Sequence, residues 1–334
     1  MMVARKRKKS PVGKLLMLLI LAAALVIGGG WWWTTRSWRA AGPLTQATDV
    51  TIPDGATLAA AARALEKAGA IKSTTGFLRQ AKLFGSDAPI RAGEYGIAAG
   101  ASPAEILTML QSGKTLQRLV TIPEGMPSVL VRDRLMAKDL LTGDVPVPAE
   151  GSVLPDSYSF ERGETRAAVL KRMQAAMTRT VDQLWRTRKP GTVVTSKADA
   201  VTLAAIVEKE TALASERAMV AAVYSNRLRT GMRLQADPTV IYPITRGKPL
   251  GRRIRRSELN AVNAYNTYAM AGLPAGPIAN PGRGAIAAVL DPAKTDALYF
   301  VANGEGGHVF AKTLAEHNAN VQRYYALRRA KGEM

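Results

Sequence analysis

The residues from Leu15 to Thr35 carry no charge, although Lys14 precedes them and Arg36 follows them. As a helix that rises about 1.5 Å per residue, this segment measures about 31 Å, which matches the hydrocarbon thickness of a bilayer. Tryptophans gather at its far end, as they do where indole rings meet lipid headgroups. They are Trp31, Trp32, Trp33 and Trp38. The sequence therefore predicts one transmembrane helix at residues 15–35.

The charges around this segment predict its orientation. Lysines and arginines crowd residues 1–14, and such residues stay on the cytoplasmic side. We therefore expect a cytoplasmic tail at 1–14, a single pass through the cell inner (cytoplasmic) membrane, and a periplasmic location from Arg36 onward. The alternative is a cleaved signal peptide with its cleavage site in "LAAALVIGGG". Its apolar stretch would normally be only about 7–15 residues long, so a retained anchor is favoured.

The expected export of the chain limits the partners that its charge can indicate. A net charge of +20 would otherwise suggest nucleic acid, but an exported domain does not meet it, so no nucleic-acid partner is expected. The chain has no cysteine, which excludes a disulfide framework, a thiol nucleophile and a thiolate metal site. Its 334 residues, 47% of them hydrophobic, are enough for two cores.

A strand–turn–helix pattern recurs after a linker expected at residues 36–48. "DVTIPDGATLAAAARALEKAGAI" predicts a strand at Val50 and Ile52, a Pro-Asp-Gly turn and a helix at 56–67. "LVTIPEGMPSVLVRDRLMAKDLL" repeats it, and between the two a strand near Tyr95 precedes a helix that opens at Ser102-Pro103. We interpret the first part as a small module of two helices on a short sheet. Chance recurrence of βα units is the alternative.

Longer helices are predicted further on, at 166–188 and 197–229. A long segment rich in Gly, Pro and Asn follows, and such segments inside compact domains are usually functional. A strand at "DALYFVAN", a glycine hairpin and a helix from Thr313 complete a mixed α+β chain.

Two glutamates near the end of "TLAAIVEKET" are predicted to differ. At about 100° per residue, Glu210 falls on the same helix face as Leu203, Ile206 and Val207, whereas Glu208 falls almost opposite. Burial raises the pKa of a carboxyl group, and a glutamic acid that is partly protonated near neutral pH suits general acid catalysis. The alternative is a buried salt bridge, for which Arg217, Arg227 or Arg233 is within reach. Periodicity leaves both open.

The blocks "IVEKETALASERAMVAAVYSNRL", "MRLQADPTVIY", "AYNTYAMAGLPAGPIANPG" and "YFVANGEGGHVFAKTLAEHN" resemble the endolytic murein transglycosylase family, also called YceG-like or MltG. "EGSVLPDSYSF", "TIPEG" and the single N-terminal anchor fit as well. The resemblance implies a LysM-like module at 49–118 and a catalytic domain at 119–334. The family's essential glutamate lies in the E-K-E-T block, and we assign it to Glu210.

The resemblance also implies the reaction. Members of the family cleave the β-1,4 bond between N-acetylmuramic acid and N-acetylglucosamine within peptidoglycan strands and leave a 1,6-anhydromuramic end. Glu210 would protonate the leaving oxygen and then accept the proton of the C6 hydroxyl, which closes onto C1. Strand termination or trimming during cell wall synthesis, and association with penicillin-binding synthases, are implied in the same way.

Polar residues of the irregular segment are candidates for substrate contacts, because amides and hydroxyls suit N-acetyl and hydroxyl groups. They are Gln235, Asp237, Tyr265, Asn266, Tyr268 and Asn280. Asp237 is alternatively a second carboxylate that would permit hydrolysis, or a turn residue before Pro238. No metal or cofactor is expected, because His308 and His317 have no ligand cluster around them in the sequence.

Two rival functions follow from these alternatives. One is a non-catalytic, membrane-tethered peptidoglycan-binding scaffold. The other is a hydrolase of the muramidase type.

Overall fold

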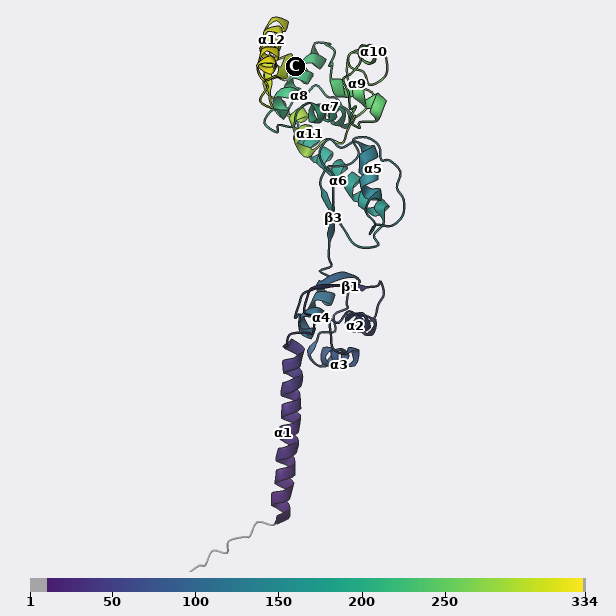
Figure 1. Cartoon of the computed structure of the whole chain (residues 1–334), viewed down its shortest axis with the longest axis vertical. Coiled ribbons are helices and arrows are strands. Elements are labelled where there is room, and N and C mark those ends of the chain that lie inside the picture. Colours follow the sequence, from purple (N-terminus) through teal and green to yellow (C-terminus); the bar gives the residue numbers. More distant parts are fainter. Residues whose placement is uncertain (1–10, 333–334) are drawn as a thin grey trace, which may run out of the picture. The chain divides into compact units, whose positions relative to one another are not determined.

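The computed structural model describes residues 11–332, and the chain divides into two compact units, Met1–Gln117 and Arg118–Met334 (Figure 1). The first ten residues of the predicted basic tail at 1–14 lie outside the described residues. Helices and three two-stranded antiparallel sheets make up the part of the chain that the structure describes. The predicted α+β class is therefore confirmed.

Helix α1, Pro11–Arg39, is long and apolar enough from Leu15 onward to cross a membrane, and no other helix among the described residues is. Its aliphatic side chains are exposed as far as Ile27. A helix with an apolar surface on all sides is typical of a segment surrounded by lipid. Its length and composition agree with the predicted span.

A linker was predicted at 36–48, but the first residues of this range belong to α1. The helix continues to Arg39, and Trp38 is only 5% exposed, with its ring 5.9 Å from that of Phe77. Gln80 Nε2 also donates a hydrogen bond of 2.6 Å to Ser37 Oγ. Trp38 is therefore a core residue of the first unit and not part of the headgroup belt, because burying an indole ring in a core stabilises more than leaving it at an interface.

The first unit is built on strands β1, Thr48–Ile52, and β2, Gly93–Ile97, with Val50 opposite Tyr95. Helices α2, Leu58–Lys67, α3, Thr74–Phe84, and α4, Pro103–Ser112, pack with them around one apolar core. Ser102 and Glu105 form a capping box at the start of α4, as its sequence predicts. Helix α3 was not predicted, because Thr74, Thr75 and Gly76 at its start are poor helix formers.

The second unit opens with β3, Arg118–Thr121, paired with β4, Ser157–Phe160, and covered by α5, Ser128–Met136. The remaining elements are α6 (Arg166–Arg186), α7 (Lys197–Glu210), α8 (Arg217–Arg229), α9 (Asp237–Thr245), α10 (Arg256–Leu259), α11 (Arg283–Leu290), β5 (Tyr299–Ala302), β6 (His308–Ala311) and α12 (Leu314–Ala330). Strands β5 and β6 form the predicted glycine hairpin, and Thr313 caps the predicted final helix.

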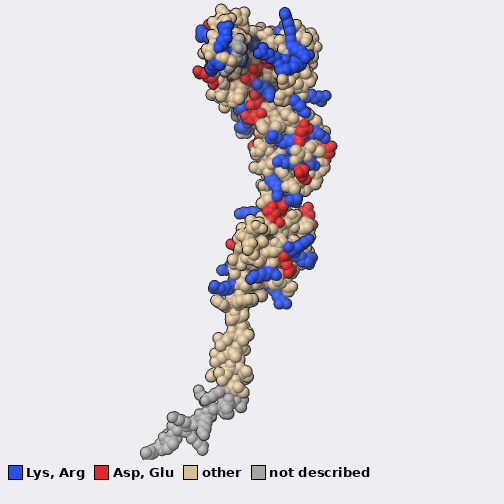
Figure 2. All heavy atoms as spheres, in the orientation of Figure 1, with Lys and Arg blue, Asp and Glu red and all other residues tan. Residues whose placement is uncertain are grey.

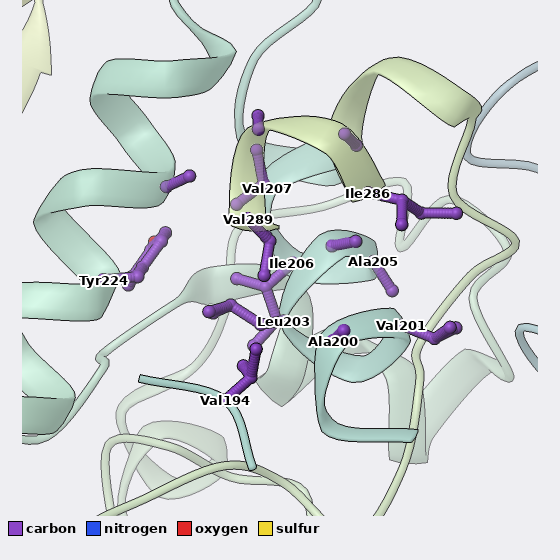
Figure 3. Close-up of a cluster of buried hydrophobic side chains, with 14 of the residues drawn as sticks. Val194, Ala200, Val201, Leu203, Ala205, Ile206, Val207, Tyr224, Ile286 and Val289 are labelled. Carbon is purple, nitrogen blue, oxygen red and sulfur yellow. The ribbon is translucent and has the colours of Figure 1, made fainter. Parts of the chain in front are cut away.

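Helix α7 is the centre of this unit. Every residue from Ala200 to Val207 is buried, and Figure 3 shows Leu203 and Ile206 directed toward Val289 of α11 and Tyr224 of α8. A helix that is apolar on all sides is a core helix. Elements that contact α7 from several directions therefore fix the position of its last residue, Glu210.

One helix was predicted at 197–229, and the structure has two. Thr211 has an extended backbone, with φ −138° and ψ 132°, and ends α7. Its hydroxyl accepts a hydrogen bond from the Leu213 amide at 3.1 Å and donates one to Glu216 Oε2 at 3.2 Å. Such local side-chain hydrogen bonds compete with helical ones, so the chain turns here before α8 begins.

We expect Trp38→Ala to destabilise the first unit by about 3–5 kcal/mol, because it removes a buried indole ring. Hydrogen exchange of the α2–α4 amides in the detergent-solubilised chain would measure the loss of protection. Trp33→Ala is the matched control, since Trp33 is 67% exposed. Equal protection in the two variants would show that Trp38 contributes no more to the core than a lipid-facing ring.

Candidate active site

Glu210 is the last residue of α7, where the core helix meets the surface. The residue as a whole is half-buried, but its Oε1 is shut away from solvent and has no hydrogen-bond partner among the described residues. A buried carboxylate oxygen with no donor is costly, whereas the protonated form avoids a buried charge. The geometry therefore favours a neutral carboxyl group.

The surroundings of Glu210 raise its pKa to about 7. Burial is the largest cause, and the negative charge of Asp237 acts in the same direction. A hydrogen bond from the Tyr224 hydroxyl and the positive charge of Arg227, both from α8, partly oppose these effects. Near neutral pH the group thus exists in both protonation states, as a residue that gives and takes back a proton requires.

Asp237 and Tyr268 lie beside this carboxyl group. Asp237 begins α9 and is exposed, and the Tyr268 hydroxyl donates a hydrogen bond of 2.6 Å to its Oδ1. Burial and the charge of Asp237 raise the pKa of the Tyr268 hydroxyl well above its usual range. The tyrosine therefore stays protonated and keeps donating. Two carboxyl groups thus meet in one site, one buried and one open to solvent.

The predicted position of Glu208 on a polar face is wrong. Its side chain is only 5% exposed, and it accepts hydrogen bonds from the Gly282 amide at 2.9 Å and from Arg217 Nη2 at 3.1 Å. Arg217 Nη2 also bonds to Glu124 Oε2, at 2.5 Å. Burial raises the pKa of Glu208, while the Gly282 amide and Arg217 lower it. The prediction failed because Arg217, on another helix, and the backbone at Gly282, distant from Glu208 along the chain, cover this side of α7.

This network also decides between the arginines proposed for a salt bridge to Glu210. Arg217 pairs with Glu208 and Glu124. Arg233 donates to the carbonyl oxygen of Tyr268, and Arg227 donates to the carbonyl oxygens of Leu298 and Leu234. Arg227 therefore acts on Glu210 by its charge while its donors serve the backbone. Among the described residues, no ion pair neutralises Glu210.

Two glycines let the backbone approach the Glu124–Arg217–Glu208 network closely. A Cβ at Gly284 would lie 2.4 Å from Arg217 Nη1, and one at Gly282 would lie 1.9 Å from Glu124 Oε1. The "NPGRG" block therefore has a packing reason for its glycines. Sequence reasoning missed Glu124 and Tyr224 as site residues, and it considered Arg217 and Arg227 only as possible salt-bridge partners of Glu210. Only Glu124 had a signal in the sequence, because the turn of the second strand–turn–helix repeat has this glutamate where the first repeat has an aspartate.

Four of the predicted substrate contacts are exposed or half-buried in the structure. Gln235 is exposed and has a left-handed backbone, with φ 52°, a conformation that non-glycine residues hold mainly at turns and functional sites. Asp237 and Tyr268 form the pair described above. Tyr265 is half-buried, with its ring 4.8 Å from that of Tyr242. Substrate contact by these four stays a prediction.

Asn266 and Asn280 are placed differently, since both are fully buried. Asn266 Nδ2 donates to the carbonyl oxygens of Glu258, Leu259 and Ala261, and its Oδ1 accepts from the Tyr268 amide. Asn280 donates to Met126 and Ser128 and accepts from the Val153 amide. Both amides hold loops in place, which argues against the predicted substrate contacts. They were mistaken for binding residues because sequence alone does not separate a buried amide from an exposed one.

The two histidines have protein partners. His308 Nδ1 lies 2.7 Å from Glu216 Oε2, and the His317 ring stacks on that of Tyr299 at 5.3 Å. Within residues 11–332, no group of three or more His, Asp or Glu side chains is arranged to hold a metal ion. The lack of a metal or cofactor in the reaction stays a prediction.

A buried carboxyl group with a pKa of about 7, beside an open carboxylate, is an arrangement that suits acid–base chemistry. The chain belongs to the YceG-like family, whose model matches residues 50–323, so the predicted resemblance is confirmed.

Relatives with known names agree with this membership. An endolytic murein transglycosylase of Bacillus subtilis (strain 168) is 30% identical over 315 residues, which cover 85% of this chain and 86% of that protein. One from Streptococcus pneumoniae serotype 2 is 29% identical and aligns with 81% of this chain but only 57% of its own length. A crystal structure of a yceG-like protein from Listeria monocytogenes matches 82% of this chain and 98% of that one, with 28% identity and a TM-score of 0.52.

We expect Glu210→Gln to stabilise the chain at alkaline pH. Because the folded-state pKa lies above the unfolded value, the carboxyl group favours folding below about pH 4, and that contribution is lost as the pH rises through about 7. At pH 8 the variant should be more stable by about 3 kcal/mol, and near pH 4 the difference should vanish. Denaturant unfolding across this pH range measures it.

Glu305→Gln, at the exposed tip of the hairpin, is the matched control and should change little at any pH. A Glu210→Gln variant that is less stable than the parent at pH 8 would contradict a buried, neutral carboxyl group.

Proposed function

We propose that the chain is an endolytic peptidoglycan transglycosylase, a lyase that cuts within glycan strands. Membership of the YceG-like family and the names of relatives that align with most of the chain support this activity. The observation that carries the chemistry is the buried carboxyl group of Glu210, with its pKa of about 7. We assign to it the role of general acid and then of general base.

In this mechanism Glu210 gives its proton to the oxygen that leaves C1 of N-acetylmuramic acid, as the β-1,4 bond to N-acetylglucosamine breaks. The C6 hydroxyl of the same sugar then forms the bond to C1 and returns its proton to the carboxylate. The products are a 1,6-anhydromuramic end and a free hydroxyl, and Glu210 finishes protonated as it began. One carboxyl group is sufficient, because neither water nor an enzyme nucleophile attacks.

A hydrolase is the second candidate, and Asp237 is the observation in its favour. Glycosidases that use water place two carboxyl groups at the bond, and the charge of Asp237 acts directly on Glu210. The two activities differ in product mass, since an anhydro end is lighter than a hydrolysed end by one water. We favour the transglycosylase because the named relatives are transglycosylases.

The remaining parts fit a protein that works at the cell wall. We propose that α1 is a retained anchor in the inner membrane with its N-terminus in the cytoplasm, that the unit around β1 and β2 is a LysM-like module for glycan, and that both units lie in the periplasm. Termination or trimming of new strands beside penicillin-binding synthases agrees with this location.

Glu210→Gln should reduce formation of anhydro ends by about 10²–10⁴-fold, because proton transfer is lost while size and hydrogen-bonding shape remain. Mass spectrometry of products from purified sacculi, with the full chain in detergent, measures this. Glu305→Gln serves as the control.

Binding of the variant to sacculi should persist. Undiminished anhydro product from Glu210→Gln would remove the catalytic role and favour a scaffold that only binds peptidoglycan. Products with hydrolysed ends from the parent chain would favour the hydrolase.

Asp237→Asn should shift the pH profile. Removing its negative charge lowers the pKa of Glu210, so the fall of kcat/KM on the alkaline side should move to lower pH. Asp296→Asn, which changes an exposed aspartate paired with Lys312, is the control. Complete loss of activity in Asp237→Asn across all pH values would instead indicate that Asp237 takes part in the chemistry, as in a hydrolase.

A further inference from the structure

Helix α3 packs along the last turns of α1 and runs in the opposite direction. Phe77 contacts Trp38, Gln80 bonds to Ser37, and Phe84 meets Trp31 edge-on with ring centroids 5.3 Å apart. Residue numbers thus rise along α3 while those of its partners fall along α1. The C-terminal end of α3 therefore points back toward the uncharged part of α1, and Figure 1 shows α3 on that side of the unit and β1 on the other.

The depth of this end follows from helix geometry. If Leu15 to Thr35 span the hydrocarbon, Trp31 lies four residues inside the outer limit, or about 6 Å at a rise of about 1.5 Å per residue. Phe84 contacts Trp31, so it lies at a similar depth. Amphipathic elements that rest on membranes bury their apolar side chains by about 5–10 Å, so the two depths agree.

The side chains at this end suit a lipid surface. Leu83 is 59% exposed, although it is a large aliphatic residue at the end of a helix. The neighbouring Lys82 is long enough to bring its ammonium group up to the headgroups while its stem stays in the apolar region. Phe84, the residue after Leu83, contacts the exposed Trp31, so the exposed apolar surface of α3 continues onto that of α1.

A hollow of about 410 Å³ lies beside these residues. Its lining comes from both helices and contains two arginines and no acidic residue: Trp32, Thr35, Arg36, Trp38, Arg39 and Phe84. Arginines bind phosphate groups with paired hydrogen bonds. Figure 2 shows basic side chains around the base of this unit, next to the uncharged surface of α1. The charge of this rim complements anionic phospholipid.

We propose that the C-terminal end of α3 is a second membrane contact: Leu83 and Phe84 enter the outer surface of the bilayer beside α1, and Arg36 and Arg39 meet lipid phosphates in the hollow between the two helices. The partner is the lipid surface itself. This inference rests on the membrane anchor proposed above. With two contacts, one from α1 and one from α3, the first unit sits on the membrane in a fixed orientation and does not swing on a linker.

The absence of cysteine makes a direct test possible, because each introduced thiol is unique. We would label Leu83→Cys, Thr51→Cys and Leu25→Cys with an environment-sensitive fluorophore, in the full chain, in nanodiscs of zwitterionic and anionic phospholipid. Thr51 is exposed on β1, and Leu25 is 73% exposed in the middle of α1. Quenching by lipids that carry spin labels near the headgroup or near the chain end reports depth.

The label at Leu83 should emit at shorter wavelength than the label at Thr51, resist quenching by iodide in water, and be quenched most by the shallow spin label. The label at Leu25 should be quenched most by the deep one. A label at Leu83 that behaves like the one at Thr51, while Leu25 is deep, overturns the second contact and leaves the anchor in place. A label at Leu25 that is open to water overturns the anchor itself, and the second contact with it.

A second test keeps the dye away from Leu83. We would label Lys82→Cys in two chains, one that is otherwise unchanged and one that also carries Leu83→Asp. Leu83 is exposed, so the aspartate leaves the core of the unit intact. The label at Lys82 should lose its protection from iodide when Leu83 is aspartate. Equal protection in both chains would overturn a contact made by Leu83.

Discussion

The exclusion of water from the end of α7 is the constraint on which the site depends. Helices α8 and α11 surround α7 so closely that its last residue, Glu210, places a carboxyl oxygen where no donor reaches it. An ionised group there would lose hydration that the Tyr224 hydroxyl and the charge of Arg227 replace only in part, so burial raises the pKa of Glu210. The reactivity of the carboxyl group is therefore a property of how the whole unit packs, and not of the glutamate alone.

Two glutamates of the same helix, Glu208 and Glu210, are both buried, and burial raises the pKa of each, but their partners differ. Glu208 is buried against Arg217 and the Gly282 amide, which supply charge and hydrogen bonds to its ionised form. Glu210 is buried with a tyrosine hydroxyl and a distant arginine, and a neighbouring carboxylate opposes its ionisation. Burial raises the pKa of both carboxyl groups, but an ion pair and a backbone amide oppose this rise at Glu208, whereas no ion pair is formed by Glu210 among the described residues. Glu208 therefore joins two distant segments through Arg217 and Gly282, and Glu210 has the surroundings that the proposed proton transfer requires.

Local patterns were enough to predict the long apolar helix near the N-terminus, the strand–turn–helix units and the inward position of Glu210, because each depends on spacing along one segment. They failed where the outcome depends on partners distant in sequence. Glu208 was assigned to a polar face because a helix wheel assumes that one face meets water. Trp38 was assigned to the lipid belt because Phe77, its core partner, lies in a helix with a weak signal of its own. Asn266 and Asn280 lie in a segment whose composition is typical of a binding loop, yet their side-chain amides donate hydrogen bonds to backbone carbonyl oxygens. The end of α7 at Thr211 depends on hydrogen bonds of one hydroxyl group, and helix propensity does not predict it.

The network of Glu124, Arg217 and Glu208 has a consequence for how sequences of this kind diverge. Its charges come from three separate stretches, and Gly282 and Gly284 leave the space that they occupy. Replacing Arg217 leaves the buried Glu208 without its ion-pair partner, and a side chain at Gly282 or Gly284 would collide with Glu124 or Arg217. A change at one of these positions therefore requires a compensating change at another, and we expect Arg217, Gly282 and Gly284 to be inherited as a set.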